Sequence, residues 1–457
     1  MDGCPGQMEN ADMNEFDARI LPPDDPQRRV LHNEVHARPS ARVRLPALIT
    51  YVALLNDGIS REQECRHLQR LPGHGDLSVD RLQGNFLRLR CDGYTVKWER
   101  HTEFTRYSIV QALPAHAGWG STLPELASQV ATGTDWVRGL PGQTVAAIHL
   151  AMLPEGMDDP QMLARAQQWL GEGMLIGSRM GNTVEGQPHS CLLSHLRIGA
   201  DGFERLLVLA SPDTPEGRGG RISQRVLELE TYRLMALRGL PVAKQLSPVL
   251  AQAESQLADI TARLEGQQGG DQALLDDLVA LAARVERATA EHGYRFSATR
   301  AYDAVVRERI RELRERPLYG TQTVGEFMQR RLSPAIATVE ATAQRLAALS
   351  ERVARTSALL RTRVDIATET QNQQLLEKLT RGQDLQLRLQ STVEGLSIAA
   401  ISYYVVSLLL YGAKALNKLG VPVHPETAAG LSIPLVLWGV WKTVQRIHDK
   451  LHRDSGH

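Results

Sequence analysis

The sequence GLSIAAISYYVVSLLLYGA, residues 395–413, contains nineteen residues without a formal charge. Glu394 precedes this run and Lys414 follows it. At about 1.5 Å per residue, a helix of this length crosses a hydrocarbon core of about 30 Å. We therefore expect a first transmembrane helix over residues 396–414. A buried helix in the core of a soluble protein is the competing interpretation.

A second apolar run follows after a short polar turn. It is charge-free over fifteen residues, 427–441, which is short for a membrane span. The run becomes long enough if Glu426 and Lys442 lie in the headgroup layer and its two terminal tryptophans form an interfacial belt. We expect a second transmembrane helix over residues 426–445. A buried hairpin is again the alternative.

Basic residues surround the two expected spans unevenly. Three precede the first span and four follow the second, namely Lys378, Arg381, Arg388, Lys442, Arg446, Lys450 and Arg453. The connection between the spans carries only Lys414 and Lys418. Because lysine and arginine accumulate in cytoplasmic loops, we expect both chain ends in the cytoplasm, including a basic tail at residues 446–457.

The overall composition limits the classes of partner and compartment. The 457 residues contain 52 lysines and arginines and 52 aspartates and glutamates, so the formal net charge is zero. The chain therefore lacks the excess of positive charge that is typical of a protein that binds nucleic acid. The four cysteines are scattered without a CxxC pair, which argues against a zinc ribbon and a disulfide scaffold. Residues 1–25 are acidic and lack the apolar core of a signal peptide, which predicts a disordered leader.

Alternating strand and helix patterns predict an α+β cytosolic domain over residues 26–212. Its clearest strands flank Asp92-Gly93, a dipeptide typical of tight hairpins. The expected strands are Leu45–Leu55, Asn85–Cys91, Tyr94–Arg100, Thr105–Ala112, Thr144–Leu153, Leu192–Ile198 and Phe203–Leu209. The expected helices are Glu62–Arg70 and Asp159–Leu170. The last two strands form a second hairpin, so much of the sheet is expected to be antiparallel.

After residue 221 the apolar period becomes helical and remains so to residue 395, which predicts an α-helical, coiled-coil stalk. We interpret the preceding Gly217–Gly220 run as a linker, because no GK[ST] follows to make a phosphate loop. The heptad residues are Ile336, Val339, Ala343, Leu346, Val353, Leu360, Val364 and Ala367. A helix from residue 334 to 394 would be about 90 Å long, so it must pair with the preceding helices or with other copies in a homo-oligomer.

Two polar clusters supply candidate ligands for a divalent metal. In an extended LHNEVHARP segment the side chains of His32, Glu34 and His36 alternate onto one face. His101 and Glu103 share a face if WERHTEF is extended. Histidine and carboxylate suit a metal or an acid–base site. A hydrogen-bonded strut that fixes the edge of the domain is the alternative.

Polar residues also recur within the first expected span. Ser397, Tyr404 and Tyr411 are seven residues apart, and Ser407 falls close to the same stripe. Polar side chains inside a span usually face protein or water. The stripe therefore predicts either a helix-packing seam or a pore lining, and we favour the seam.

Four strings together resemble an uncharacterised bacterial family of predicted membrane-anchored proteins. They are LHNEVHARP (31–39), WERHTEF (98–104), LLRTRVD (359–365) and LQSTVEGLSIAAISYY (389–404). The resemblance covers nearly the whole chain. It implies membrane anchoring, which we expect to be in the bacterial inner membrane. It carries no established activity, so no catalytic or cofactor-binding residue follows from it.

The expected architecture is also similar to that of CorA-type divalent-cation channels, which are pentamers. These channels carry Gly-Met-Asn at the outer end of the first span, where this chain has Tyr411-Gly412-Ala413-Lys414. Our leading hypothesis is an oligomeric CorA-like transport or membrane-scaffold assembly in contact with the lipid bilayer. The alternative is a membrane-tethered metal-dependent enzyme. No nucleophile–base triad or cofactor fingerprint favours an enzyme.

Overall fold

The computed structural model describes residues 24–29, 31–32, 40–156, 161–181, 186–266, 270–418 and 424–454, the last eight by backbone alone. The chain divides into two compact units. The first comprises Met1–Thr261 with Leu278–Ala354, and the second comprises Ala262–Asp277 with Arg355–His457. The segment Ala262–Asp277 lies between the two parts of the first unit in sequence and belongs to the second unit.

The first unit contains a mixed sheet, which confirms the expected α+β fold. Among the described residues the sheet has nine strands in the order β2-β3-β4-β1-β5-β8-β7-β6-β9. Their bounds are β1 Ala47–Leu55, β2 Phe86–Cys91, β3 Tyr94–Arg100, β4 Phe104–Ala112, β5 Gln143–Pro154, β6 Ile176–Met180, β7 Ser190–Ile198, β8 Glu204–Ala210 and β9 Arg316–Pro317. The strands β5 and β8 run parallel, and the other neighbours run antiparallel.

Both expected hairpins are confirmed. Strands β2 and β3 pair with Cys91 opposite Tyr94, and Gly93 in the turn has a φ of 75°, which glycine adopts without steric cost. Strands β7 and β8 are joined through Gly202, whose φ is 83°. Strand β1 lies between β4 and β5, so the apolar run at 47–55 is at the centre of the sheet.

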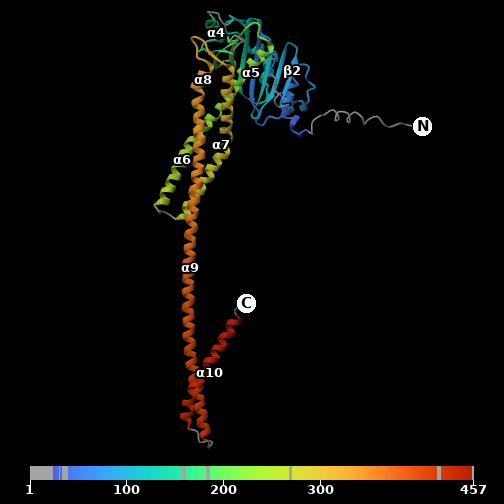
Figure 1. Ribbon diagram of the computed structural model, residues 1–457. Helices are drawn as coiled ribbons and strands as arrows, with labels where there is room; N and C mark the ends of the chain where they lie inside the picture. Colours follow the sequence, from blue (N-terminus) through green and yellow to red (C-terminus); the bar gives the residue numbers. More distant parts are fainter. Residues whose placement is uncertain are drawn as a thin grey trace, which may run out of the picture. The chain divides into compact units, whose positions relative to one another are not determined.

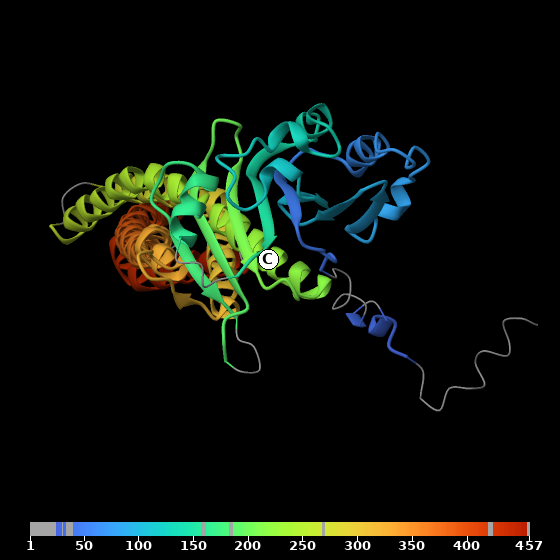
Figure 2. The same cartoon turned by 90° about the horizontal axis from the view of Figure 1, so that it is seen from above.

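Helices cover both faces of the sheet (Figure 2). The short helices of this unit are α2 Arg61–Leu68, η1 Val79–Leu82, η2 Ala115–Ala117, η3 Ala127–Gln129, α3 Thr134–Arg138, α4 Met162–Leu170 and α8 Val324–Arg331. Strand β1 is buried on both sides because its side chains alternate. Ile49 and Tyr51 join one core cluster, and Leu48 and Val52 join clusters on the opposite face.

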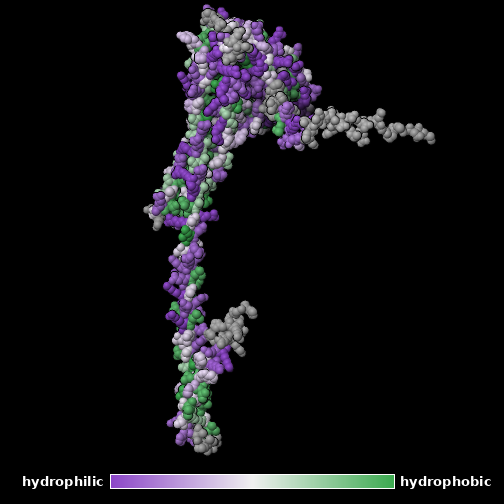
Figure 3. Space-filling model, in the orientation of Figure 1, coloured by the Kyte–Doolittle hydropathy of each residue, from purple (hydrophilic) through white to green (hydrophobic). Residues whose placement is uncertain are grey.

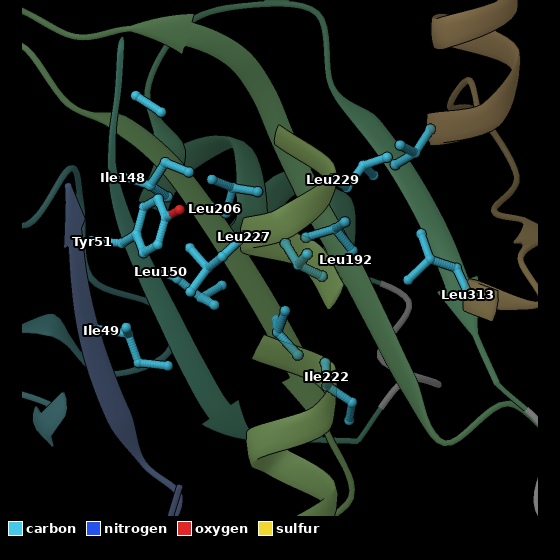
Figure 4. Close-up of a cluster of buried hydrophobic side chains, with 14 of the residues drawn as sticks. Ile49, Tyr51, Ile148, Leu150, Leu192, Leu206, Ile222, Leu227, Leu229 and Leu313 are labelled. Atoms are coloured by element: carbon cyan, nitrogen blue, oxygen red, sulfur yellow. The ribbon is translucent and has the colours of Figure 1, made fainter. Parts of the chain in front are cut away.

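Helix α5 (Glu216–Leu237) supplies the cover on the first of these faces (Figure 4). Its residues Ile222 and Leu227 are buried with Ile148 and Leu150 of β5. Burying a side chain of this size contributes about 1.5–3 kcal/mol. On the opposite face α4 buries Trp169. The sheet is thus a layer between helices.

The glycine run at 217–220 is part of α5, which corrects the expectation of a linker. The space around these glycines explains why: a Cβ on Gly220 would stand 1.6 Å from the carbonyl oxygen of Ala41, and one on Gly219 would stand 2.7 Å from that of Val43. The amide of Val43 also donates to the carbonyl of Glu216 over 3.1 Å. The glycines therefore allow the segment at 41–43 to lie directly against the first turns of the helix.

Three long helices follow, α6 Gly239–Glu265, α7 Asp271–Leu313 and α9 Ser333–Lys418 (Figure 1). Within the first unit α9 packs on the earlier helices of its own chain, since Arg345 forms an ion pair of 2.8 Å with Glu254 of α6. The heptad residues Ile336, Val339 and Val353 are at most 3% exposed. This part of the heptad seam is therefore covered within the chain.

The second unit holds the rest of α9 and α10 (Pro425–Asp454). Near its start Leu360 is fully buried, and Arg363 donates to the carbonyl of Leu264 over 2.9 Å. From residue 365 to residue 393 every side chain of α9 is exposed. Beyond that point the described buried residues are Ser402 of α9 and Ala429 of α10.

Candidate functional site

The first cluster of predicted metal ligands is mostly outside the described part of the chain. Glu34 and His36 lie in residues 33–39, which the structure does not describe, and His32 is exposed. Within the described ranges no three histidine, cysteine or acidic residues are grouped to hold a metal ion. The metal hypothesis for these residues therefore stays a prediction.

The second cluster takes a different form from the extended segment that the sequence pattern indicates. Strand β3 ends at Arg100, and the chain turns before β4, with the amide of His101 donating to the carbonyl of Phe104 over 2.8 Å. The His101 ring stacks on Phe104 with 4.5 Å between ring centres. Glu103 belongs to this turn, because two neighbouring antiparallel strands must reverse here. His101 and Glu103 are therefore close in sequence without sharing a strand face.

Two residues of α7 hold the Glu103 carboxylate. The Tyr302 hydroxyl donates to it over 2.6 Å, and the Arg295 guanidinium forms an ion pair with it. Burial, and then the Glu103 carboxylate, raise the pKa of Tyr302 above its usual value, so this phenol stays a donor. Glu103 acts here as an acceptor for α7. That arrangement matches the strut interpretation for this residue.

Glu103 also lines a polar pocket of about 910 Å³ in the first unit. The ends of β1 and β3, the start of β5, the C-terminal end of α5 and part of α7 form its wall. The volume lies in the range of sites that take small molecules. We call it the arginine pocket, because Arg100, Arg238 and Arg295 all contribute to its lining.

The three arginines differ in how they are neutralised. Arg100 forms an ion pair of 2.7 Å with the buried Glu64 and donates to the carbonyl of Ile59 over 2.8 Å. Arg295 is paired with Glu103. Arg238 lies between α5 and α6, and its guanidinium makes no hydrogen bond or ion pair with any described residue. The Nε of this guanidinium is buried. Burial, and then the like charge of Arg295, lower the pKa of Arg238.

A network of charged side chains is buried between the sheet and α5. Glu99 of β3 pairs with Lys97 over 3.1 Å and with Arg106 of β4 over 2.5 Å. Arg106 also pairs with Glu228 of α5 over 3.2 Å, and Arg309 of α7 reaches Glu228 over 2.7 Å. Burial opposes ionisation of Glu99, but the adjacent positive charges hold its pKa below the usual value. Each of these charges is paired with an opposite one, which suits a structural cross-link.

Two carboxyl groups approach each other at a second buried position. Glu204 of β8 lies beside Glu230 of α5, and Arg233 binds Glu230 through its Nε at 2.9 Å. Burial, and then the charge of Glu230, raise the pKa of Glu204 to about 9. Two like charges in one buried site cannot both ionise at low cost. Glu204 therefore holds its proton at neutral pH.

The two apolar runs are helical and long and apolar enough to cross a membrane, which supports association with one. Among the described residues, the first of these helices ends at Asn417, and the second covers Pro425–Arg446. Apolar surface is concentrated over them in Figure 3. Many of their large side chains are exposed, among them Leu408, Leu431 and Leu435, each at least 71%. Within the second unit the helices bury little of their apolar surface against each other.

The polar stripe of α9 lies away from the buried position of its span. Tyr404 and Tyr411 are 68% and 69% exposed, Ser397 is exposed and Ser407 is half-buried. Ser402 is 5% exposed, and it lies about 160° around the helix from Tyr404 at 100° per residue. The described part of this chain therefore leaves Tyr404 and Tyr411 largely uncovered.

Sequence reasoning identified Glu103 and overlooked the arginine pocket. The pocket collects residues from positions 55–59, 100–103, 142–143, 238 and 294–295. No motif joins them. Arg238 and Arg295 stand in helices where arginine is ordinarily a solvated residue, and only the packing of α5 and α7 beside the strand ends brings them together.

Comparisons with known proteins agree with the resemblance seen in the four sequence strings. No curated protein and no solved structure matches the chain. The similarity to CorA-type channels is therefore without support from a structure. The family described as "Protein of unknown function (DUF3422)" matches residues 23–451, almost the whole chain, and the protein belongs to that family.

Proposed function

We propose that the protein is an oligomeric, multi-pass assembly of the bacterial inner membrane, which holds its first unit on the cytoplasmic side as a scaffold. The observation that carries this proposal is the exposed apolar surface of the two helices at 396–446. A patch of this size is unfavourable in water. Lipid is the environment that would cover it.

Aromatic and basic residues support a position for the second helix in the bilayer. The ammonium group of Lys442 lies 4.6 Å from the ring centre of Trp438, and Trp441 is 47% exposed beside it. Tryptophan and lysine gather at the boundary between hydrocarbon and water. This cluster would mark the cytoplasmic boundary, with the basic tail beyond it.

Self-association is supported by the part of α9 that precedes the membrane. Residues 365–393 have no cover from the described part of the chain, although they include large apolar side chains. The exposed ones are Ile366, Leu375, Leu376, Leu379, Leu385, Leu387, Leu389 and Val393. A lone helix of this kind gains little stability in water, because most helical stability comes from packing. Other copies of α9 would supply that packing, and the stripe at Tyr404 would continue it within the membrane.

The test is the mass of the full-length protein in lipid nanodiscs, measured by native mass spectrometry across a range of protein concentrations. The proposal expects a defined oligomer. A monomer at every concentration would contradict it.

Neighbouring tyrosines provide a matched pair of variants. Tyr404→Phe removes a hydroxyl from the stripe and should weaken association by about 0.6 kcal/mol, roughly threefold in the dissociation constant. Tyr403→Phe removes the same group one residue away, about 100° around the helix, and should leave association unchanged. If Tyr404→Phe assembles normally and changes ion flux in vesicles, the stripe lines a pore.

A further inference from the structure

We propose that the arginine pocket binds a small polar molecule through a phosphate or carboxylate group, with Arg238 as its main cationic partner. The site is independent of membrane anchoring and self-association. It is formed entirely by residues of the first unit.

The charge balance of the pocket singles out Arg238. Arg100 is neutralised by Glu64, and Arg295 is neutralised by Glu103. Arg238 has no such partner among the described residues, and Asp57 is an exposed residue of the lining. One half-buried guanidinium therefore faces a polar pocket with its donors unused.

The shape of a guanidinium determines which ligands it prefers. Its planar donors match two oxygens of a carboxylate or phosphate, and such charge-assisted hydrogen bonds are stronger than neutral ones. A bound oxyanion would also relieve the repulsion between Arg238 and Arg295. Arg295 also lines the pocket, so it can share the ligand with Arg238 while it holds Glu103.

The neutral part of the pocket fits the polar remainder of a ligand. Asn56, Thr102 and Gln143 line it together with the backbone at Gly58 and Gly142. Thr102 and Gln143 are exposed and offer a hydroxyl and an amide, whereas the amide nitrogen of Asn56 already donates to the carbonyl of His101. A polar organic anion, such as a phosphate ester or a hydroxy acid, is the class of ligand that these groups suit.

The experiment measures thermal unfolding of the full-length protein in nanodiscs, with inorganic phosphate or citrate titrated against chloride at equal ionic strength. Phosphate and citrate stabilise most proteins without binding a site. The readout is therefore the difference between the wild type and Arg238→Gln. A ligand bound to the folded state raises stability with its concentration.

We expect Arg238→Gln to weaken binding of at least one of the two anions by about tenfold or more, because a hydrogen bond to a charged group is lost. Arg307→Gln, at an exposed arginine of α7 outside the pocket, should keep the wild-type response. Glu103→Gln removes a competing negative charge and should strengthen binding several-fold.

Arg238→Gln should weaken anion binding, and Glu103→Gln should strengthen it. Structural damage to the pocket would weaken binding in both variants, so opposite changes distinguish a role in binding from damage. If the wild type and Arg238→Gln respond equally to both anions, the proposal is overturned. It is also overturned if Glu103→Gln binds the anions no better than the wild type.

Discussion

Glu204 shows how a single side chain links the fold to pH. Its carboxyl is buried beside Glu230, and its pKa is about 9 in the folded protein. In the unfolded chain a glutamate has a pKa of about 4.3. Between these values the folded state binds one proton more than the unfolded state, so the free energy of unfolding falls as pH rises. The stability associated with this proton is fully present below about pH 4 and is lost towards pH 9.

Glu204→Gln should remove that pH dependence, because glutamine keeps the shape and never ionises. We expect the variant to unfold near the wild-type temperature at about pH 5 and at a higher temperature at about pH 9. The fluorescence of the buried Trp98 and Trp169 follows unfolding of this unit. Glu308→Gln, at an exposed glutamate of α7, should behave as the wild type at both pH values. An equal shift in the two variants would contradict the argument.

The candidate sites show what single residues reveal in a sequence. Glu103 stands out because it repeats a polar pattern, yet its role depends on Arg295 and Tyr302, which follow it by nearly two hundred residues. Arg238 has no local signal at all. The buried charges of Glu99 and Arg106 also resemble an exposed strand face in sequence. The alternation of side chains along a strand shows which residues share a face. It does not show whether a charge on that face is solvated or is neutralised by a helix that packs on the sheet.

Helix α5 depends on glycine at one contact. A Cβ on Gly220 would overlap the carbonyl oxygen of Ala41, so Gly220→Ala must displace the 41–43 segment or the helix. We expect a loss of about 1–3 kcal/mol or more in the free energy of unfolding. Denaturant unfolding of the full-length protein, followed by tryptophan fluorescence, measures it.

Gly217→Ala is the matched control, three residues earlier in the same helix. Its Cβ would meet only the end of the Arg221 side chain, at 3.6 Å. Alanine is preferred over glycine in helices by about 0.5–1 kcal/mol. This variant should be neutral or slightly stabilising. Equal destabilisation in both variants would show that the close contact is not the cause.

Elements with strong local signals can be predicted well. The hairpin at Asp92-Gly93 and the apolar strand at the sheet centre lie where the sequence pattern predicts them, as do the long helices. Strand β6 escapes prediction, because IGSRM has one glycine, two polar residues and no clear alternation. Strand β9 is two residues, Arg316–Pro317, and only its pairing with β6 makes it a strand. The glycines of α5 resemble a linker because glycine locally disfavours a helix. The contact of the helix with the segment at 41–43 nevertheless requires glycine there.

At the scale of the whole molecule, the proposed membrane topology follows from the charge distribution. A reporter fused after His457 should behave as cytoplasmic, and one inserted at Pro422 should behave as external. Paired alkaline phosphatase and fluorescent-protein fusions measure this. Two reporters on the same side would mean that the helix beginning at Pro425 does not cross the membrane.

The position of β9 has a consequence for synthesis of the chain. Strand β8 ends at Ala210 and β9 begins at Arg316, and the core of the sheet also includes Leu313 and Ile336. At about 5–20 residues per second, the ribosome needs roughly 5–20 s to make the residues between the two strands. During that interval the nascent sheet has an open edge and an incomplete apolar core, both of which favour aggregation. Chaperone protection of the emerging sheet would be needed most between residues 210 and 336.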